Sequence, residues 1–296
     1  MNNYIILAIS VLVSTANNML MNVTGKRSGL KSISAKVMYN AVLFSVIFLG
    51  ILIFNGGFTQ ASTPTVMYGV LYGVFAAVTY VTSLLAYATG PMNFTVLIVY
   101  CVGLLIPTVL GPVIWTENNA VTLIQWIGVA LLIVSLVLGL KSSDGGKFNF
   151  KWLIFALLSA VTCGMLGIVQ QAHQKSYASE ELNMMLIVAF GTAIIIAVIY
   201  SLISSNHDKT NPVKEFRPVD YGAAAGSGLC LGFANVANLF LSGALPAIIF
   251  FPIVNGGLVI LSTIMSLIVF KEKLNLRQSI GVVLGIIALM LICGIV

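Results

Sequence analysis

Residues 182–203 read LNMMLIVAFGTAIIIAVIYSLI, a run without a single charged side chain. At about 1.5 Å of rise per residue, a helix of this length crosses the roughly 30 Å hydrocarbon core of a bilayer. Ten apolar stretches of this kind fill the chain, and the polar segments between them are mostly short. They are too long and too poor in charge to be core elements of a soluble protein. The sequence therefore predicts a polytopic integral membrane protein.

The composition favours helices as the spanning elements. Of the 296 residues, 59% are hydrophobic and only 7% are charged, and the mean hydropathy is +1.06. Nearly every segment must then satisfy its own backbone hydrogen bonds in lipid, as an α-helix does. A β-barrel would alternate apolar and polar residues at every second position, and the sequence lacks this alternation. We therefore expect an all-α fold.

The charge and the cysteines exclude other classes. The net charge is +6, but the basic residues lie in a few connecting loops rather than on one soluble face, so we expect no nucleic-acid partner. Cys101, Cys163, Cys230 and Cys293 each lie in an apolar stretch, without a CxxC pair or a nearby His at ligand spacing. We expect neither a disulfide framework nor a metal site, and no cofactor.

The ten predicted spans alternate with loops of uneven charge. They cover residues 4–23, 37–54, 66–88, 92–114, 121–140, 151–171, 182–203, 219–242, 245–269 and 278–295. Thirteen of the fourteen Lys and Arg residues lie in or beside the loops after spans one, five, seven and nine, and only Lys175 lies on the opposite side. By the positive-inside rule, the basic loops face the cytoplasm and both termini face outward, in a bacterial plasma (inner) membrane. The longest loop, 204–218, carries Asn, Asp and Pro and is expected to be irregular.

Self-comparison indicates an internal duplication. A shift of 153 residues pairs Tyr68-Gly69 with Tyr221-Gly222 and Ile127-Gly128-Val129 with Ile280-Gly281-Val282, and a shift of 149 pairs Ser10 with Ser159 and Ser14 with Cys163. Chance similarity is the competing explanation, because any two Gly- and Ile-rich sequences align to some degree. Several motifs here share one offset, which favours a true duplication. Because each five-span unit has an odd number of spans, the second copy enters the membrane inverted. The predicted units, 1–144 and 145–296, form an inverted repeat, which is typical of secondary transporters.

The segment after span nine carries a resemblance to a known family. Phe270-Lys271-Glu272-Lys273-Leu274 precedes Ile280-Gly281-Val282-Val283-Leu284-Gly285, and the first half has a weaker version in Trp115-Thr116-Glu117 and Ile127-Gly128-Val129-Ala130-Leu131. Together with the ten spans, these motifs resemble the drug/metabolite transporter superfamily in its EamA-type ten-helix form, over essentially the whole chain. The chain departs from the family's mid-span prolines, because Pro107 lies late in span four and span nine offers Asn255-Gly256-Gly257. The resemblance implies metabolite transport without naming a solute.

A transporter needs polar groups near the middle of its spans, where polar groups that face hydrocarbon are costly. The candidate solute-binding residues are Ser14, Asn17, Asn18, Tyr80, Tyr87, Tyr100, Gln170, Asn235, Asn238 and Asn255. Hydrogen bonding between packed helices is the competing explanation, and for a single Ser or Tyr it is the more frequent one. The carboxamides are stronger candidates, because one neighbouring helix rarely satisfies both donors and the acceptor.

Glycines recur at helical spacing on two spans. Gly69 with Gly73 on span three, and Gly228 with Gly232 on span eight, have the small-xxx-small spacing that lets helix backbones approach closely, as Gly222 and Gly226 also do. We expect these glycines to serve packing rather than gating.

No Asp, Glu, Lys or Arg lies well inside any predicted span, whereas proton-coupled carriers usually hold an ionisable group there. We therefore expect a facilitator or exchanger of a small neutral or zwitterionic metabolite, with amino acids among the candidates, working by alternating access around a midplane cavity. A cation held over tyrosine faces is also compatible with these residues. The expected partners are the solute and membrane lipid. Solute identity, direction, coupling ion and oligomeric state, a homodimer included, are left open.

Two other functions stay open. One is a proton-coupled drug or cation exporter that uses His173, although a lone His at the end of a span is more often an interfacial side chain. The other is a non-transporting membrane scaffold. An enzyme is not expected, because two His and no intramembrane carboxylate offer little from which to assemble an acid, a base or a nucleophile. Glu272, between two lysines, is expected to be structural.

Overall fold

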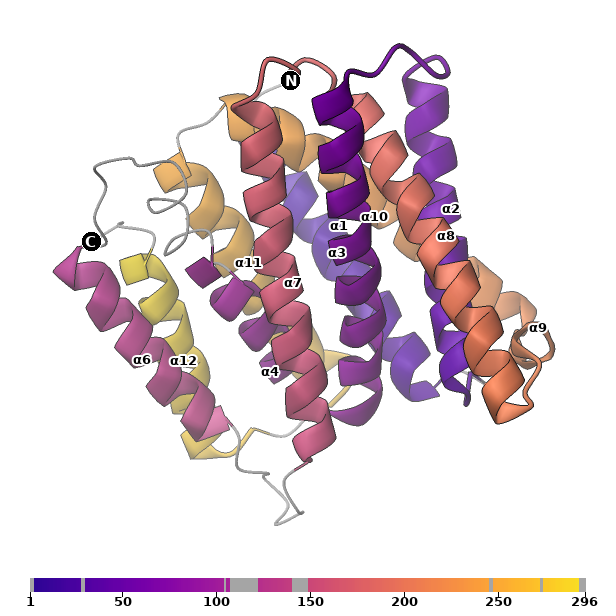
Figure 1. Ribbon diagram of the computed structural model, residues 1–296. Helices are drawn as coiled ribbons and strands as arrows, with labels where there is room; N and C mark the ends of the chain where they lie inside the picture. Colours follow the sequence, from indigo (N-terminus) through magenta and orange to yellow (C-terminus); the bar gives the residue numbers. More distant parts are fainter. Residues whose placement is uncertain are drawn as a thin grey trace.

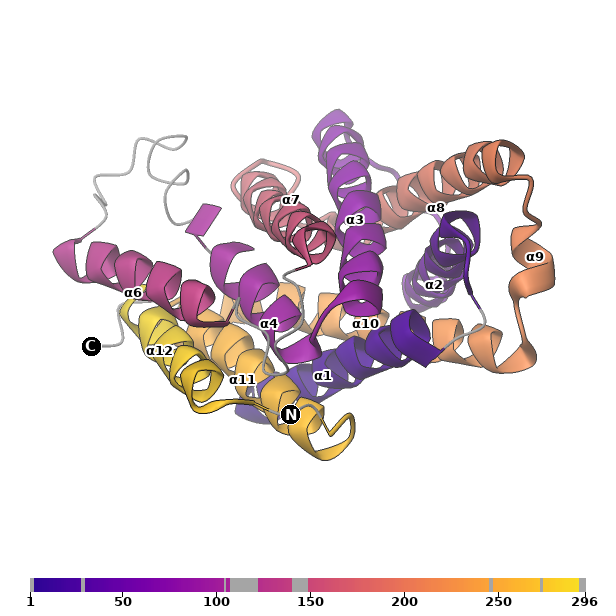
Figure 2. The same ribbon diagram turned by 90° about the horizontal axis from the view of Figure 1, so that it is seen from below.

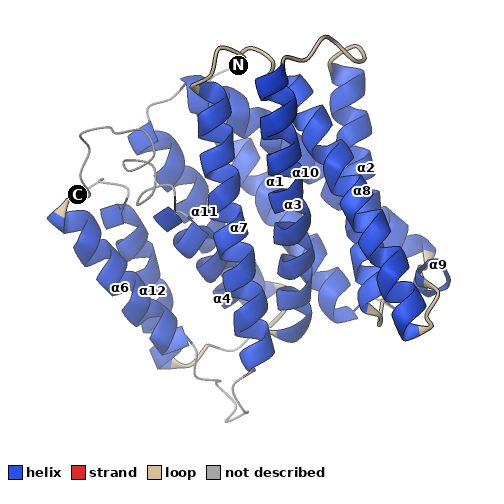
Figure 3. Cartoon of the chain, in the orientation of Figure 1, coloured by secondary structure: helices blue, strands red, loops and turns tan. Residues whose placement is uncertain are grey.

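The computed structural model describes residues 3–27, 30–103, 105–106, 122–139, 149–244, 247–271 and 274–292, and its regular elements are all helices (Figures 1 and 3). They are α1 (Asn3–Arg27), α2 (Ile33–Phe54), α3 (Thr63–Thr89), α4 (Met92–Leu97), the π-helical η1 (Ile98–Val102), α6 (Leu123–Gly139), α7 (Phe150–Gln174), α8 (Leu182–Asp208), α9 (Pro212–Glu215), α10 (Pro218–Ala244), α11 (Ala247–Ile268) and α12 (Leu276–Ile292). The expected all-α fold is thereby confirmed.

Each predicted span coincides with a helix wherever it is described, but the segment 204–218 differs from expectation. α8 continues through Asp208, and Asn211 begins the short α9 by accepting hydrogen bonds from the N–H groups of Val213 and Lys214, at 3.1 and 3.3 Å. The prediction of an irregular loop is wrong for most of this segment, because capping by one Asn nucleates a turn that hydropathy does not reveal. Pro107, Glu117, Glu272, Lys273 and Cys293 lie outside the described residues.

Five helices are long and apolar enough to cross a membrane: Asn3–Lys26, Ile33–Phe54, Thr63–Thr89, Phe150–Gln174 and Leu182–His207. Shorter apolar helices include Leu276–Leu291 and Val254–Ile268. Large apolar side chains such as Leu12, Leu49 and Ile195 point outward and are more than half exposed. A soluble protein rarely exposes so much apolar surface, whereas lipid accepts it. These helices indicate an integral membrane protein.

The bundle has a central group of helices between two outer pairs. α6 and α12 lie side by side at one edge, and α2 and α8 pack together at the other, next to α9 (Figures 1 and 2). Between these edges, α3 packs on α7 and α8, and α10 packs on α1 and α2. α11 packs on α1 and α4, while α7 packs on η1. Six elements, α1, α3, η1, α7, α10 and α11, therefore surround the middle of the bundle.

Close backbone approach at two of these contacts depends on glycine. A Cβ added at Gly73 would lie 2.3 Å from the carbonyl oxygen of Ala189 on α8, and one added at Gly69 would lie 2.8 Å from the Val188 Cβ. On α10, a Cβ at Gly228 would lie 2.8 Å from the Leu43 carbonyl oxygen of α2. The packing role expected for these glycines is confirmed. Gly222 has nothing within 4 Å of such a Cβ, so the expectation does not extend to it.

The connecting segments gather at two ends of the bundle. At one end, the Glu215 carboxylate accepts hydrogen bonds from the N–H groups of Lys31 and Ser32, at 2.8 and 3.0 Å, and Lys26 Nζ lies 5.9 Å from the centre of the Phe270 ring. The segments that follow α1, α8 and α11 therefore meet at this end. Burial raises the pKa of the Glu215 carboxyl, but the hydrogen bonds from Ser32 and Lys31 outweigh it, and the pKa lies below its usual range.

At the other end, Glu181 ties the start of α8 to the start of α3. Its carboxylate accepts hydrogen bonds from the Ser62 N–H and hydroxyl groups, at 2.8 and 2.9 Å. Hydrogen bonds from Thr65 and Ser62 hold the pKa of the Glu181 carboxyl below its usual range. Because the segments after α2 and α7 meet here, and those after α1, α8 and α11 meet at the opposite end, α2 and α7 run in one direction and α1 and α8 in the other.

Candidate solute-binding cavity

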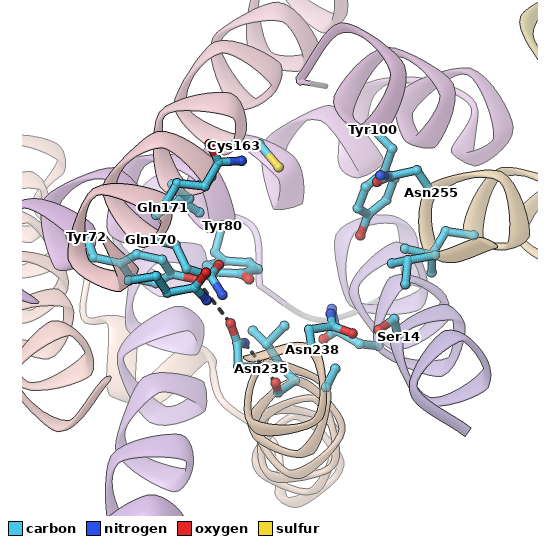
Figure 4. A pocket seen from close by; sticks show the side chains of 18 residues that line it. Ser14, Tyr72, Tyr80, Tyr100, Cys163, Gln170, Gln171, Asn235, Asn238 and Asn255 are labelled. Atoms are coloured by element: carbon cyan, nitrogen blue, oxygen red, sulfur yellow. Dashed lines mark hydrogen bonds between the residues drawn. The ribbon is translucent and has the colours of Figure 1, made fainter. Parts of the chain in front are cut away.

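A polar cavity of about 230 Å³ lies in the middle of the apolar bundle (Figure 4). All six central elements contribute to its wall. The lining residues are Ser14 and Asn17 of α1, Tyr72 and Tyr80 of α3, Tyr100 of η1, Cys163, Leu166, Gly167, Gln170, Gln171 and Gln174 of α7, Leu231, Ala234, Asn235 and Asn238 of α10, and Val254, Asn255 and Leu258 of α11. Among these residues none carries a formal charge at neutral pH, and the described chain holds no cluster of His, Cys, Asp and Glu that could bind a metal.

Eight of the ten candidate residues line this cavity. The other two, Asn18 and Tyr87, lie just beyond its wall and are buried, at 3% and 2% exposure. Asn18 still contacts the lining, because its Oδ1 accepts a hydrogen bond from the Tyr100 hydroxyl at 3.4 Å. Tyr87 lies about two turns beyond Tyr80 along α3. Helical periodicity placed both on the same face as lining residues, but it does not reveal where along the helix a cavity ends.

The α10 wall is tied to its neighbours. Asn235 Oδ1 accepts a hydrogen bond from the Tyr72 hydroxyl at 3.1 Å, and its amide group donates to the Leu231 carbonyl at 2.8 Å. Asn238 Oδ1 accepts from the Ser10 hydroxyl at 2.7 Å. Asn235 therefore has both ends of its carboxamide engaged, whereas the Asn238 amide nitrogen has no partner among the described contacts. Helix packing therefore uses both hydrogen-bonding groups of the Asn235 side chain, but only the carbonyl oxygen of Asn238.

Asn17 on α1 is a buried group of the wall whose hydrogen-bonding capacity is largely unsatisfied. Its side chain is 2% exposed, its Oδ1 has no hydrogen-bond partner, and its amide nitrogen has only the Met21 sulfur, at 3.8 Å. Leaving a buried carbonyl unpaired costs about 1–3 kcal/mol. A group that carries this cost beside a cavity is well placed to bind whatever enters it.

The α7 wall supplies the largest number of polar groups. Gln170 and Gln171 are partly exposed to the cavity, and Figure 4 shows their side chains near Tyr72 and Tyr80. Neither carboxamide has a hydrogen-bond partner among the described residues. Opposite them, Tyr100 lies on η1, a π-helical segment of the kind that frequently occurs at functional sites.

Sequence reasoning missed several lining residues, most clearly Tyr72, Cys163 and Gln174. Tyr72 lies eight positions before Tyr80, so extending the polar stripe of α3 by two turns would have found it. Cys163 aligns with Ser14 under the 149-residue shift, but a cysteine within an apolar stretch gives little indication of a polar site. Gln174 lies at the end of α7, where a loop was expected.

The α7–α3 contact closes the bundle directly beyond the cavity. The Thr79 hydroxyl donates to Thr162 Oγ1 at 2.7 Å, and the Ser159 hydroxyl donates to the Thr79 carbonyl oxygen at 3.1 Å. About two turns further toward the beginning of α7, the Trp152 indole N–H donates to Thr95 Oγ1 of α4 at 2.8 Å. This hydroxyl ladder lies on the side of the cavity toward the beginning of α7.

His173 lies outside the cavity wall. Its ring is completely buried between α7 and α3, with Nε2 3.1 Å from Thr65 Oγ1 and an edge contact to Tyr68. The ring lies in the last turn of α7, at the end of the span as expected, and α3 covers it. A second hollow, between α2 and α10, is lined by apolar side chains such as Val46, Leu229 and Phe233. It offers a polar solute no partner.

Comparisons with known proteins bear on the fold alone. No family model matches the chain, and no curated protein matches it. Twenty-eight chains of solved structures match. One of them, described only as a crystal structure of a protein, has a TM-score of 0.63 and 12% identity, and the match covers 98% of this chain and 95% of that one. The helix arrangement along nearly the whole chain is therefore one that also occurs in a solved structure. The class that fold and site define is an all-helical protein with membrane-spanning helices and a central polar cavity.

Proposed function

We propose that this protein is a secondary transporter, a facilitator or exchanger, that carries a small uncharged or zwitterionic metabolite by alternating access. The observation that carries the proposal is the cavity with polar side chains that six elements of an apolar bundle surround, and whose wall includes Asn17 with a buried, unpaired carbonyl. Polar groups around a cavity in an apolar bundle cost free energy, and binding of a solute offsets that cost.

The helix contacts support ten spans arranged as two inverted five-helix repeats. In that arrangement α1, α2, α3, α4 with η1, and α6 correspond to α7, α8, α10, α11 and α12. The contact of α3 with α7 then corresponds to that of α10 with α1, and the contact of α3 with α8 corresponds to that of α10 with α2. The contacts α2–α8, α6–α12 and α4–α11 correspond to themselves. Contacts that map onto one another in this way are what a twofold axis in the membrane plane requires.

Single residues support the same pairing. The 149-residue shift matches Ser14 with Cys163 and Asn17 with Leu166, and all four line the cavity. It also matches Ser10 with Ser159, and each of these serines hydrogen-bonds to the corresponding helix, α10 or α3. The cavity would thus lie on the axis between the repeats, where secondary transporters bind their solutes.

The loop charges support an orientation. If the basic loops face the cytoplasm of a bacterial inner membrane, α7 begins at the cytoplasmic side and ends outside, and both termini face outward. The cavity reaches Gln174 at the outer end of α7, and the hydroxyl ladder lies on the cytoplasmic side. The structure would then be the state that opens outward, and transport would require the α3–α7 contact to open.

The resemblance to the EamA-type drug/metabolite transporters agrees with this proposal, and we propose membership of that superfamily. Nothing in the cavity favours proton coupling, because His173 contributes nothing to its wall and the described lining has no carboxylate.

Counterflow in reconstituted vesicles tests the proposal. Vesicles loaded with unlabelled amino acids, nucleobases or sugars should take up the labelled form of one class faster than protein-free vesicles. Asn17→Leu should abolish this exchange, whereas Asn206→Leu, the same change at an exposed position of α8, should not. No exchange of any solute would overturn the proposal and favour a scaffold. Flux that follows an imposed pH gradient and is lost in His173→Gln would favour the proton-coupled exporter.

A further inference from the structure

We infer that the solute is a nucleobase, meaning an uncharged planar heteroaromatic ring whose edge carries adjacent hydrogen-bond donors and acceptors. The inference rests on the proposed function, since it concerns the same cavity. Its basis is the combination of an uncharged wall, unpaired carboxamides and apolar surfaces for the faces of a ring.

The absence of charge in the described wall decides against ionic solutes. A carboxylate or an ammonium group taken from water into an apolar enclosure costs several kcal/mol unless it is paired. The wall offers tyrosine hydroxyls, carboxamides, a serine and a thiol, but no Asp, Glu, Lys or Arg. A zwitterionic amino acid would bring two unpaired charges, and a nucleotide would bring its phosphates. Within the proposed range of neutral and zwitterionic metabolites, the cavity therefore favours the neutral ones.

The unpaired polar groups of the wall suit the edge of a base. Gln170 and Gln171 offer complete carboxamides, Asn238 offers its amide group, and Asn17 adds a buried carbonyl oxygen without a partner. A carboxamide presents a donor and an acceptor side by side, which is the pattern by which Asn and Gln pair bidentately with adenine. A quaternary amine has no donors or acceptors and would leave these groups unpaired.

The rest of the wall suits the faces of a flat ring. Leu166, Leu231, Val254 and Leu258 supply apolar surface between the polar positions. Three tyrosines, Tyr72, Tyr80 and Tyr100, also contribute, and bases stack readily on aromatic rings. A sugar carries hydroxyl groups around its whole circumference, so the apolar positions would leave several of them unpaired.

The size of the cavity agrees with a small ring. About 230 Å³ is below the range of about 300–1,000 Å³ that is typical for drug-sized ligands. It holds several water molecules, and so has room for a one-ring or two-ring base.

Binding to the purified full-length protein tests the inference. Adenine or uracil should raise the melting temperature and give saturable binding by calorimetry, whereas glucose, leucine and choline should do neither. Gln170→Leu should weaken nucleobase affinity about tenfold or more, because one bidentate pair is lost. Gln60→Leu, the same change in an exposed loop, should leave the affinity unchanged.

The outcomes separate this inference from the proposed function. Binding and counterflow of glucose, leucine or choline, with no response to either base, would overturn the assignment of a nucleobase as the solute. The proposed transport function would still hold. Base binding without base counterflow would keep the site and overturn transport. No binding and no counterflow of any solute would overturn both. Base binding that Gln170→Leu leaves intact would overturn the assigned edge.

Discussion

Ser83 on α3 and Ser159 on α7 face each other across the bundle, with their hydroxyl oxygens 2.5 Å apart. Both side chains are buried, and Ser159 also reaches the Thr79 carbonyl oxygen. In the proposed inverted repeat, the α3–α7 contact corresponds to the α10–α1 contact, where the Ser10 hydroxyl donates to Asn238 Oδ1 at 2.7 Å. If the protein works by alternating access, the Ser83–Ser159 contact lies on the closed side of the cavity and should open when the cavity changes access.

A disulfide across the first contact should stop transport. In the double variant Ser83→Cys with Ser159→Cys, the two sulfur atoms replace oxygens that already lie in contact, so oxidation should form the bond. The oxidised protein should lose counterflow because α3 and α7 can no longer separate, and it should still bind solute from the cavity side. Reduction should restore counterflow. Each single Cys variant, treated with the same oxidant, serves as control, and full counterflow in cross-linked protein would contradict the assignment of this contact.

Gly73→Ala should destabilise the bundle. Its new Cβ would lie 2.3 Å from the Ala189 carbonyl oxygen and 2.7 Å from Thr192 Cβ, so α3 and α8 must move apart, at a cost of about 1–3 kcal/mol. Gly222→Ala is the matched control, since nothing lies within 4 Å of its Cβ and helix propensity alone favours Ala by roughly 0.5–1 kcal/mol. Thermal unfolding in detergent measures both. Equal melting temperatures for the two variants would contradict the close approach of α3 and α8.

Asn22→Leu should raise stability while reducing transport. Asn22 is fully buried on α1, one turn beyond Asn18, and neither atom of its carboxamide has a hydrogen-bond partner. Removing an unsatisfied buried amide should stabilise the fold by about 1–2 kcal/mol. If the cytoplasmic half opens during transport, Asn22 lies on its wall, and counterflow should fall. Asn183→Leu, which breaks a paired carboxamide (Nδ2 to Asn55 Oδ1, 3.1 Å), should instead lower the melting temperature. A destabilised Asn22→Leu protein would show that this amide is satisfied after all.

Glu181 should make stability depend on acid pH. Hydrogen bonds from Thr65 and Ser62 lower the pKa of its carboxyl in the folded protein, whereas an unfolded Glu titrates at about 4.3. The stabilisation is therefore present above about pH 4.3 and is lost as the pH falls through the folded pKa. Glu181→Gln should melt below the wild type at pH 7 and converge with it at acid pH, below the folded pKa of this carboxyl. Glu180→Gln, at the exposed neighbouring position, should follow the wild type throughout. A constant gap between Glu181→Gln and wild type across this range would contradict the prediction.

Much of the site was accessible from helical periodicity, because residues three, four or seven positions apart share a face in any α-helix. That rule found Ser14, Asn17, Gln170 and Asn238 on the cavity wall. It could not separate Asn235, whose carboxamide is occupied by Tyr72 and Leu231, from Asn17, whose carbonyl is unpaired. Hydrogen-bond satisfaction depends on the neighbouring helices, and one helix's sequence does not specify these.

The sequence by itself determined that this chain is helical and apolar enough for a membrane, because backbone hydrogen bonding in lipid and the length of each apolar run admit few other structures. It also predicts the side on which the basic loops lie and the pairing of Ser10 with Ser159. Only the tertiary structure decided which polar side chains meet, such as Tyr72 with Asn235 and Ser83 with Ser159, and which are left unpaired. The reason is physical: periodicity defines the face of a helix, but close packing of several helices defines where their faces separate into a cavity.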